Sequence, residues 1–554
     1  MSDSRSWLRC AALALALAAT AAPAVAQHPL MALPLDDPAY QQLAALVRRG
    51  CGEARVSAFR PFTIEQIRGA LVSARASSRC AGSVLDELER RFLIVDEAGD
   101  DAASGAVAES ASDTATGFGF GAALQLRGTA LRNGELRPLW RDIRPTSEGD
   151  PPAVARADLR LTWSGGPRIM AVVDAYGQTD RRNDPLIRAR RFRSTSGVVD
   201  FAEAYASGKL GPVVVSVGRG REAWLGDPGD PAESLVLSAN GPPLDRILLD
   251  AQWTRFQFRA LVGSLDDVVL TPARDAIPDS VGEQRWHRML VAHALTFRPS
   301  SKLELTIGET GVIPRLGGGV DLAFANPLMI YQVTQNDASP TPRRNGGVNL
   351  TAFGAVRASM GRASLQGELL VDDIQIDSKD RKVFPDQLAW NVAGSVALPV
   401  ELPASIGVQY RRTGSFTYLS WSYANSWQQY DQPIGSELGP DADMARLFGE
   451  LWPSGKLRLS GGVSRWRRGA NRLNERPVPS REGHSGDPFP STTPTRPEVQ
   501  RAWGVDAGVQ WLGAILPVTL RLEGASVENV NNTATASRTF GRASLSATYR
   551  FRFP

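Results

Sequence analysis

The chain has 554 residues, 43% of them hydrophobic, with a formal net charge of +4 and only three cysteines and four histidines. The nearly balanced charge and the lack of a basic run exclude a nucleic-acid-binding protein. The length allows several ordinary domains or one large barrel with an appendage, and the generous glycine and tryptophan content is unlike that of a compact enzyme.

The first 26 residues have the pattern of an export signal. Arg5 and Arg9 precede an apolar run from Cys10 to Ala22, and Ala24-Val25-Ala26 supplies small residues for cleavage. The run is too short to span a bilayer, and no run of eighteen uncharged apolar residues follows it. We therefore predict an exported chain that begins near Gln27 and is either soluble or a β-barrel.

Residues 27–98 differ in pattern from everything after them. Asp36-Asp37-Pro38 predicts a capped helix with proline in its first turn, and the segment from Thr63 to Gln66 is a capping box that opens a second helix. A third amphipathic stretch runs from Ser83 to Ile94. The sequence thus predicts a periplasmic helical bundle over 27–98, followed by a linker over 99–117.

Two cysteines, Cys51 and Cys80, lie within the predicted bundle. They are the only cysteines after the predicted cleavage site, and an exported chain matures in an oxidising compartment. A disulfide is the simple prediction. Catalytic or metal-binding cysteines are the alternative, although no histidine cluster accompanies them.

From residue 118 to residue 554 apolar and polar residues alternate, as is typical of strands with two different faces. The last strand shows it most clearly, because its odd positions from Gly541 to Phe553 are apolar or small and its even positions are polar or charged. A soluble sheet could only expose such charged faces outward, whereas a barrel can turn them toward a wet lumen. The same alternation recurs over residues 156–163, 255–260, 303–307, 362–369, 456–461 and 520–524.

The connections between these strands fall into two lengths. Segments such as 164–167 and 453–455 are short, whereas those around 178–200, 222–245, 310–345, 412–443 and 468–499 are long. Short turns at one end and long loops at the other are typical of outer-membrane barrels. We therefore predict a mainly β protein, a transmembrane outer-membrane β-barrel of about 18 antiparallel strands over 118–554, in a Gram-negative-type bacterium.

The first candidate binding segment lies between residues 201 and 243. Arg219 and Arg221 are suited to bind carboxylates, Trp224 offers a ring face for a sugar, and Asn240 follows in the same loop. Together these groups suit an acidic polysaccharide. The alternative is that Arg219, Arg221 and Glu222 form an ion-pair cluster that holds a loop inside the lumen.

The second candidate segment runs from Phe416 to Asp443. Its aromatic density, including Tyr423 and Trp427, could form a sugar platform, although Tyr418 and Trp421 fit an interfacial aromatic girdle better. Asp441 and Asp443 could bind a cation between acidic sugars, but two loop carboxylates do not make a metal site.

The sequence lacks the motifs of the common hydrolases. Neither GxSxG nor HExxH occurs in the mature chain, and the four histidines are scattered. We predict a protein that is not an enzyme and has no cofactor or catalytic residue. An outer-membrane hydrolase that uses His293 with a lumen carboxylate is an alternative.

A set of short segments in a fixed order resembles the capsule-assembly Wzi family of outer-membrane proteins. Leu225, Asp227 and Pro242 depart from the family pattern. The matching segments are LDDPAYQQLAALVRRG, RPFTIEQIRGAL, RMLVAHALTFRP, LLVDDI and IGSELGPDAD, together with Gly218, Arg219, Arg221, Trp224, Gly226, Ser238, Asn240 and Pro243.

The resemblance implies a monomeric barrel with a periplasmic helical bundle, whose outer face binds capsular or exopolysaccharide and helps to hold capsule on the cell. Outer-membrane lipid and possible polysaccharide export machinery are the other expected partners. Because charged lumen faces also suit a water-filled channel, a diffusion porin is the main alternative function.

Overall fold

The computed structural model describes residues 28–78, 80–93, 116–132, 153–179, 197–226, 233–271, 282–335, 348–374, 386–420, 422–430, 432–473, 475, 489–513 and 516–553. The predicted export signal over 1–26 and nearly all of the predicted linker over 99–117 lie outside these residues, so both stay predictions. The first barrel strand begins at Thr116, two residues before the predicted start of the barrel.

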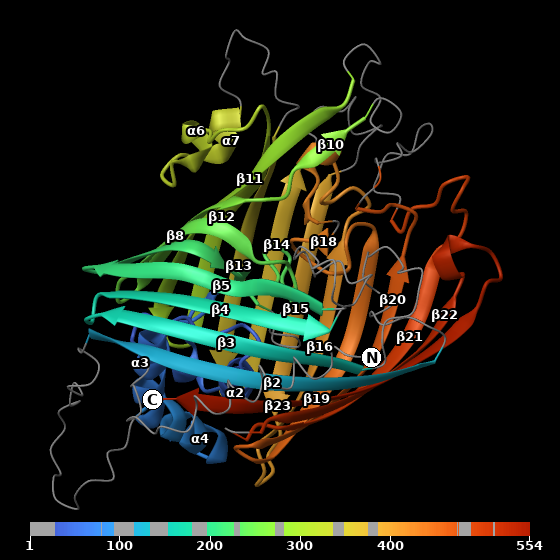
Figure 1. The fold of residues 1–554 in the computed structure, drawn as a ribbon. Helices are drawn as coiled ribbons and strands as arrows, with labels where there is room; N and C mark the ends of the chain where they lie inside the picture. Colours follow the sequence, from blue (N-terminus) through green and yellow to red (C-terminus); the bar gives the residue numbers. More distant parts are fainter. Residues whose placement is uncertain are drawn as a thin grey trace, which may run out of the picture.

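The main body is a closed antiparallel barrel (Figure 1). Among the described residues nineteen strands form one sheet, and eighteen of them close into a ring, which confirms the predicted architecture. β10 (Val268–Leu270) is the nineteenth and pairs with the loop end of β11. The ring consists of β2 (Thr116–Arg132), β3 (Ala153–Gly165), β4 (Ile169–Thr179), β5 (Gly197–Leu210), β6 (Val213–Gly220), β8 (Leu244–Gln252), β9 (Phe256–Ser264), β11 (Gln284–Ser300), β12 (Leu303–Leu316), β13 (Asn349–Met360), β14 (Ala363–Asp373), β15 (Gln387–Ala397), β16 (Ala404–Thr413), β19 (Ala442–Ser454), β20 (Leu457–Arg468), β21 (Gln500–Trp511), β22 (Val518–Glu528) and β23 (Arg538–Phe553).

The barrel closes where the first strand meets the last. β2 pairs with β23 from Phe120 opposite Phe553 to Arg132 opposite Gly541. In this arrangement the apolar positions of both strands, such as Leu126 and Leu545, share the exposed outer face. The period of two in the sequence therefore predicts correctly which side chains face outward.

The outer face is apolar and carries aromatic side chains near both ends. Exposed Trp253 and Trp511 lie near the short turns, and exposed Tyr410 and Trp503 lie near the long loops. Such aromatic residues mark the two interfaces of a membrane-spanning barrel. No described helix is long and apolar enough to cross a membrane.

Three helices lie at the short-turn end of the barrel: α2 (Ala39–Arg48), α3 (Ile64–Arg75) and α4 (Ser83–Phe92). The predicted capping box of α3 is present, with the Thr63 side chain accepting from the Gln66 N–H and the Gln66 side chain accepting from the Thr63 N–H.

A disulfide joins Cys51 to Cys80, so both sulfurs are bonded and neither is free to be a metal ligand.

The helices are fastened to the barrel wall by buried polar contacts. Arg48 of α2 forms a salt bridge of 2.6 Å with Glu450 of β19, and both side chains are buried. Gln42 donates to the carbonyl of Gly455 in the β19–β20 turn at 2.9 Å. Trp452 of β19 belongs to the same apolar core as the helices. Because a buried charge needs its partner, these contacts fix the position of the helices on the barrel.

The segment after α2 enters the barrel and meets a loop that comes from the opposite end. β1 (Phe59–Arg60) pairs with β7 (Ala223–Trp224), with Phe59 opposite Trp224. Ser57 donates to the Gln257 side chain of β9 at 2.8 Å. The lumen is therefore occupied from both ends, in line with the alternative that a loop is held inside the barrel.

We predict that the disulfide stabilises the helical region rather than the barrel. It closes a loop with a sequence separation of 29 residues, and such a cross-link contributes about 3 kcal/mol to the free energy of unfolding. A Cys51→Ser/Cys80→Ser variant should show faster hydrogen exchange in α2–α4 and unchanged exchange in β19–β23. Equal exchange of the helices in both proteins would contradict this role.

We further predict that the Arg48–Glu450 pair holds the helices to the barrel. Glu450→Gln leaves a buried arginine without its full charge partner, at a cost of about 3–5 kcal/mol. Limited proteolysis should then release residues 28–93 faster than in the wild type. The matched control, Arg48→Met, removes the buried arginine and leaves Glu450 paired with Arg458 at 3.1 Å, so it should be more resistant than Glu450→Gln. If Glu450→Gln is cleaved no faster than the wild type, the pair does not hold the helices.

Candidate functional site

The two candidate segments of the sequence fold into the barrel and bind each other. The Ser238 N–H donates to the Ile434 carbonyl at 2.8 Å, and the Tyr418 hydroxyl donates to the Leu235 carbonyl at 2.6 Å. Burial raises the pKa of the Tyr418 phenol, so the hydroxyl stays a neutral donor. Loops that the sequence places far apart, after β6 and after β16, thus form one unit inside the lumen.

A buried salt bridge adds to this unit. Glu233 of the first loop contacts Arg411 of β16 at 2.9 Å, and it also accepts from the Glu437 N–H of the second loop at 2.8 Å. Sequence analysis missed Glu233 and Arg411. The only available signal was that Arg411 occupies an inward position of its strand, and this does not identify its partner.

Trp224 and Trp427 are core residues of this unit. Both rings are fully buried, Trp224 packs against Phe59 and Phe353, and the Trp427 indole N–H donates to the Val236 carbonyl at 3.4 Å. A buried ring offers no face to a sugar chain. The predicted sugar-stacking role of these two tryptophans is therefore corrected to a packing role. Tyr418, expected in an interfacial girdle, is buried in the same core.

The predicted ion-pair cluster exists with different members. Glu222 forms salt bridges of 2.7 Å with both Arg246 and Arg259, and Arg259 also contacts Asp250 at 3.3 Å. These side chains are buried in the lumen beside Trp224, whose indole N–H donates to Glu222 at 3.3 Å. The loop is held inside the barrel by arginines of β8 and β9 rather than by Arg219 and Arg221.

Arg219 and Arg221 point to different places. Arg219 lies on the same strand face as the exposed Val215 and Val217, and binds Asp245 at 2.8 and 2.9 Å with its side chain 31% exposed. Arg221 lies beyond the end of β6, where it donates to the Gly241 carbonyl at 3.4 Å and where burial lowers the pKa of its guanidinium. They do not form a common fork.

Asn240 lies in the same corner of the molecule as these arginines. It is partly exposed, and its side chain donates to Glu233 at 3.5 Å. Arg219, Arg221 and Asn240 thus lie around the loop end of β6 and β8, where the first loop turns back into the barrel. We call these three residues the polar corner.

Asp441 and Asp443 do not converge on one point. Asp441 is buried in the loops and accepts from the N–H groups of Ser491 and Asn471 at 2.9 and 3.0 Å. Burial raises the pKa of the Asp441 carboxyl, and these hydrogen bonds oppose the shift. Its donors leave it no role as an open cation ligand.

Asp443 lies on the outer face of β19, on the side of the exposed Leu447. It accepts from Arg467 at 3.1 Å and from the Tyr410 hydroxyl at 3.1 Å. Tyr423 is partly buried against a separate apolar cluster that contains Trp286. Tyr423, Asp441 and Asp443, which belong to one candidate segment of the sequence, therefore have different surroundings in the structure.

His293 contacts a carboxylate, but on the outside of the barrel. Its Nε2 lies 3.4 Å from Glu309, and the ring of Tyr331 covers it with a centroid distance of 4.4 Å. Its neighbours Ala292 and Ala294 belong to the inner core, so His293 faces outward. The lumen pairing required by the predicted hydrolase is not formed.

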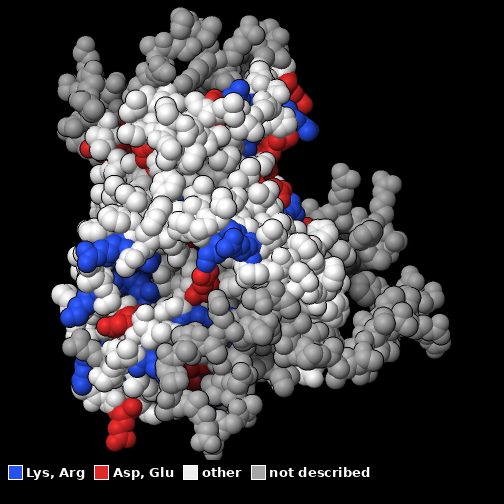
Figure 2. Space-filling view, turned by 90° about the vertical axis from the view of Figure 1, so that its left-hand side faces the viewer, with Lys and Arg blue, Asp and Glu red and all other residues white. Residues whose placement is uncertain are grey.

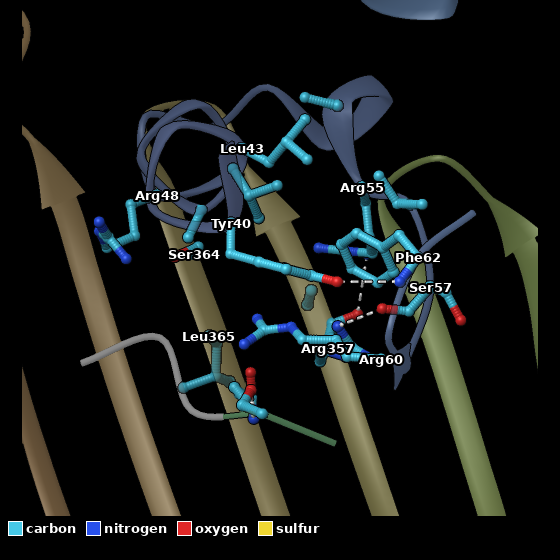
Figure 3. Close-up of a pocket in the computed structure, with 17 residues that line it drawn as sticks. Tyr40, Leu43, Arg48, Arg55, Ser57, Arg60, Phe62, Arg357, Ser364 and Leu365 are labelled. Carbon is cyan, nitrogen blue, oxygen red and sulfur yellow. Dashed lines mark hydrogen bonds between the residues drawn. The ribbon is translucent and has the colours of Figure 1, made fainter. Parts of the chain in front are cut away.

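A cavity of about 70 Å³ lies between α2, the segment after it and the strands β13 and β14 (Figure 3). Arg55, Arg60 and Arg357 line it, and Arg357 donates to the Ser57 carbonyl at 3.2 Å. Burial lowers the pKa of the Arg55 guanidinium to about 10. The volume is far below the roughly 300 Å³ of a small-ligand site, so this cavity is a seam between the helical region and the barrel.

Comparisons with known proteins place the chain in a family. The family model of the capsule assembly protein Wzi matches residues 89–540. No curated protein matches the chain by sequence. Among solved structures, Wzi of Escherichia coli is 14% identical, covers 94% of this chain and 99% of its own, and has a TM-score of 0.57. It is described as an outer-membrane protein involved in group 1 capsule assembly and as a carbohydrate-binding β-barrel.

Two Pseudomonas aeruginosa proteins show weaker similarity. OccD3 (OpdP) is 10% identical, covers 79% of this chain and 92% of its own, and has a TM-score of 0.42. OpdQ is 11% identical, covers 79% of this chain and 98% of its own, and also has a TM-score of 0.42. Because the family model spans most of the chain and the closed barrel agrees with it, this outer-membrane protein belongs to the capsule assembly protein Wzi family.

Proposed function

We propose that the protein binds extracellular polysaccharide at the long-loop end of the barrel and helps to assemble or attach capsule at the cell surface. The observation that carries this proposal is the family match over residues 89–540. The family relative from Escherichia coli is described as carbohydrate-binding. The inward folding of the two loops supports binding at the surface, because the interior is already occupied by their own side chains.

The polar corner supports an acidic polysaccharide as the ligand. Arg219 is partly exposed and binds Asp245 with two nitrogens at 2.8 and 2.9 Å and Asp200 at 3.4 Å, so a sugar carboxylate would compete with these side chains for the guanidinium. Arg221 does not share this position, but it holds the Gly241 carbonyl at 3.4 Å beside Asn240, whose amide can donate to sugar hydroxyls. Trp224, Trp427 and Asp441 act indirectly in this proposal, since they hold the loops that carry the corner.

The architecture supports proposals for the remaining partners. We propose that the barrel acts as a monomer surrounded by outer-membrane lipid, with the helical region on the periplasmic side. In that position the helices are the part of the chain that could contact polysaccharide export machinery. The protein acts without catalysis in this proposal, since His293 and Glu309 lie on the outer face under Tyr331.

A diffusion porin is the competing function. Charged inward positions are common to both classes. Against a porin, Phe59, Trp224 and Trp427 are fully buried inside the ring, where an open pore would have water. The buried pairs of Glu222 with Arg246 and Arg259 hold this filling in place.

We predict that Arg219→Gln/Arg221→Gln/Asn240→Ala weakens binding of polygalacturonate by about tenfold or more. Each hydrogen bond to a charged group contributes roughly 1.5–3 kcal/mol, and about 1.4 kcal/mol corresponds to a factor of ten. Binding would be measured on the purified protein in detergent, with dextran as the neutral polymer.

The matched control is Arg362→Gln, which removes an exposed arginine from the turn between β13 and β14 at the other end of the barrel. It should bind like the wild type. If the triple variant bound polygalacturonate as tightly as the wild type, the polar corner would not be part of the binding site. If the wild-type protein bound neither polygalacturonate, nor dextran, nor the native exopolysaccharide, the proposed function itself would be contradicted.

We also predict that the protein gives no large, steady current in a planar lipid bilayer, because the described part of the lumen is filled. An open diffusion porin measured in the same bilayers provides the positive control. A large and steady open-channel conductance of the wild-type protein would instead support the porin.

A further inference from the structure

A short helical segment lies outside the barrel, beside β11 and β12 (Figure 1). It contains α6 (Leu322–Ala325) and α7 (Tyr331–Gln335), and it follows β12 in the chain. Phe324 and Tyr331 are each 1% exposed, because they pack on the barrel wall. We call residues 320–335 the outer segment.

The alternation of the strands shows that the outer segment covers the outer face. In β11, Leu290 and Ala292 belong to the core inside the barrel, whereas Met289 and Val291 belong to the cluster of Phe324 and Tyr331. The wall formed by β11 is therefore buried on both sides at this level: the loops cover its inner face and the outer segment covers its outer face.

The other surface of the outer segment is apolar and has no cover among the described residues. Leu322 is 79% exposed, Leu328 82%, Ile330 58% and Val333 64%. Asp321 is the only charged residue over 320–335, and it is paired with Arg315 at 2.7 Å. Figure 2 shows the same side of the molecule, and its upper part carries a broad uncharged area with Lys, Arg, Asp and Glu along its edges.

This apolar surface continues the lipid-facing band of the barrel. Leu295 and Ile307 are exposed on the outer face of β11 and β12, each two residues nearer to the short turns than His293 or Glu309. The ring of Tyr331 lies on His293, and the Tyr331 N–H donates to Glu309 at 2.7 Å. The outer segment thus begins where exposed aliphatic side chains end, and it covers the two polar side chains that would otherwise face lipid.

We propose that the outer segment is embedded in the outer leaflet of the membrane, with Leu322, Leu328, Ile330 and Val333 in contact with lipid acyl chains. An apolar, nearly uncharged surface of this kind is stabilised at a membrane interface and is unfavourable in water. The segment also shields the His293–Glu309 pair, because a charged group on the lipid face of a barrel is costly near the bilayer centre. This role is independent of polysaccharide binding.

Spin labelling tests the proposal directly. Cys51 and Cys80 are joined in a disulfide, so a nitroxide added to the refolded chain without residues 1–26 reacts with an introduced cysteine. Labels would be placed by Leu328→Cys and Val333→Cys, both at exposed positions where no packing is lost. In proteoliposomes, electron paramagnetic resonance would compare collision with oxygen, which concentrates in lipid, and with a water-soluble nickel chelate.

Two further variants calibrate the result. Val408→Cys places a label on the exposed outer face of β16, and Lys302→Cys places one in the exposed β11–β12 turn. We expect the labels at 328 and 333 to match the Val408 label, with an oxygen-to-nickel ratio several-fold above that of the Lys302 label. A ratio like that of Lys302 would show that the segment lies in water. Low access to both reagents would show a protein contact instead, and either result would overturn the proposal.

Discussion

The ladder between β2 and β23 is the constraint on which the structure depends. In lipid, an unpaired backbone N–H or carbonyl has no water to bind, so a membrane-spanning sheet cannot leave an edge open. The ladder runs from Phe120 and Phe553 to Arg132 and Gly541 and joins the first strand to the last. Once the ring is closed, the alternation of each strand sorts its side chains into an outer and an inner set.

A ring of eighteen strands encloses more space than the side chains of its own wall can fill. Here the described part of the interior is filled by segments that enter from both ends. Phe59 comes from the short-turn end, Trp224 and Trp427 come from the long-loop end, and all three share one apolar core. Buried salt bridges such as Glu222–Arg246 and Glu233–Arg411 fix the polar parts of these segments. The filling supports the proposal that polysaccharide binds at the loop surface.

The barrel wall is therefore covered by other parts of the chain on its inner face and, at β11 and β12, on its outer face as well. In β11, neighbouring residues alternate between the core inside the barrel and the cluster under α6 and α7 outside it. This arrangement accounts for polar groups at outward positions. His293 and Glu309 are tolerated because Tyr331 covers them, and Asp443 is tolerated because Arg467 and Tyr410 contact it near the loop end of β19.

The sequence by itself determined the local features of this protein. The period of two sorted Leu545 and its odd-numbered neighbours to the outer face, the lengths of the connections separated the two ends of the barrel, and Thr63 with Gln66 marked the start of α3. Each of these features depends on backbone geometry within a few residues, so a single chain segment carries the whole signal. The Wzi-like order of segments likewise indicated the family.

Only the tertiary structure decided what covers each side chain. Trp224 and Trp427 are residue types that often stack on sugars, yet both are buried in one apolar core. Trp224 packs against Phe59, and Trp427 contacts the loop that follows β6. Asp441 and Asp443 are two residues apart and both are buried, but Asp441 lies among the loops and Asp443 is covered on the outer face of β19 by Arg467 and Tyr410. Periodicity assigns a residue to a face, whereas its burial depends on distant segments that fold back onto that face. Those long-range contacts leave no local pattern in the chain.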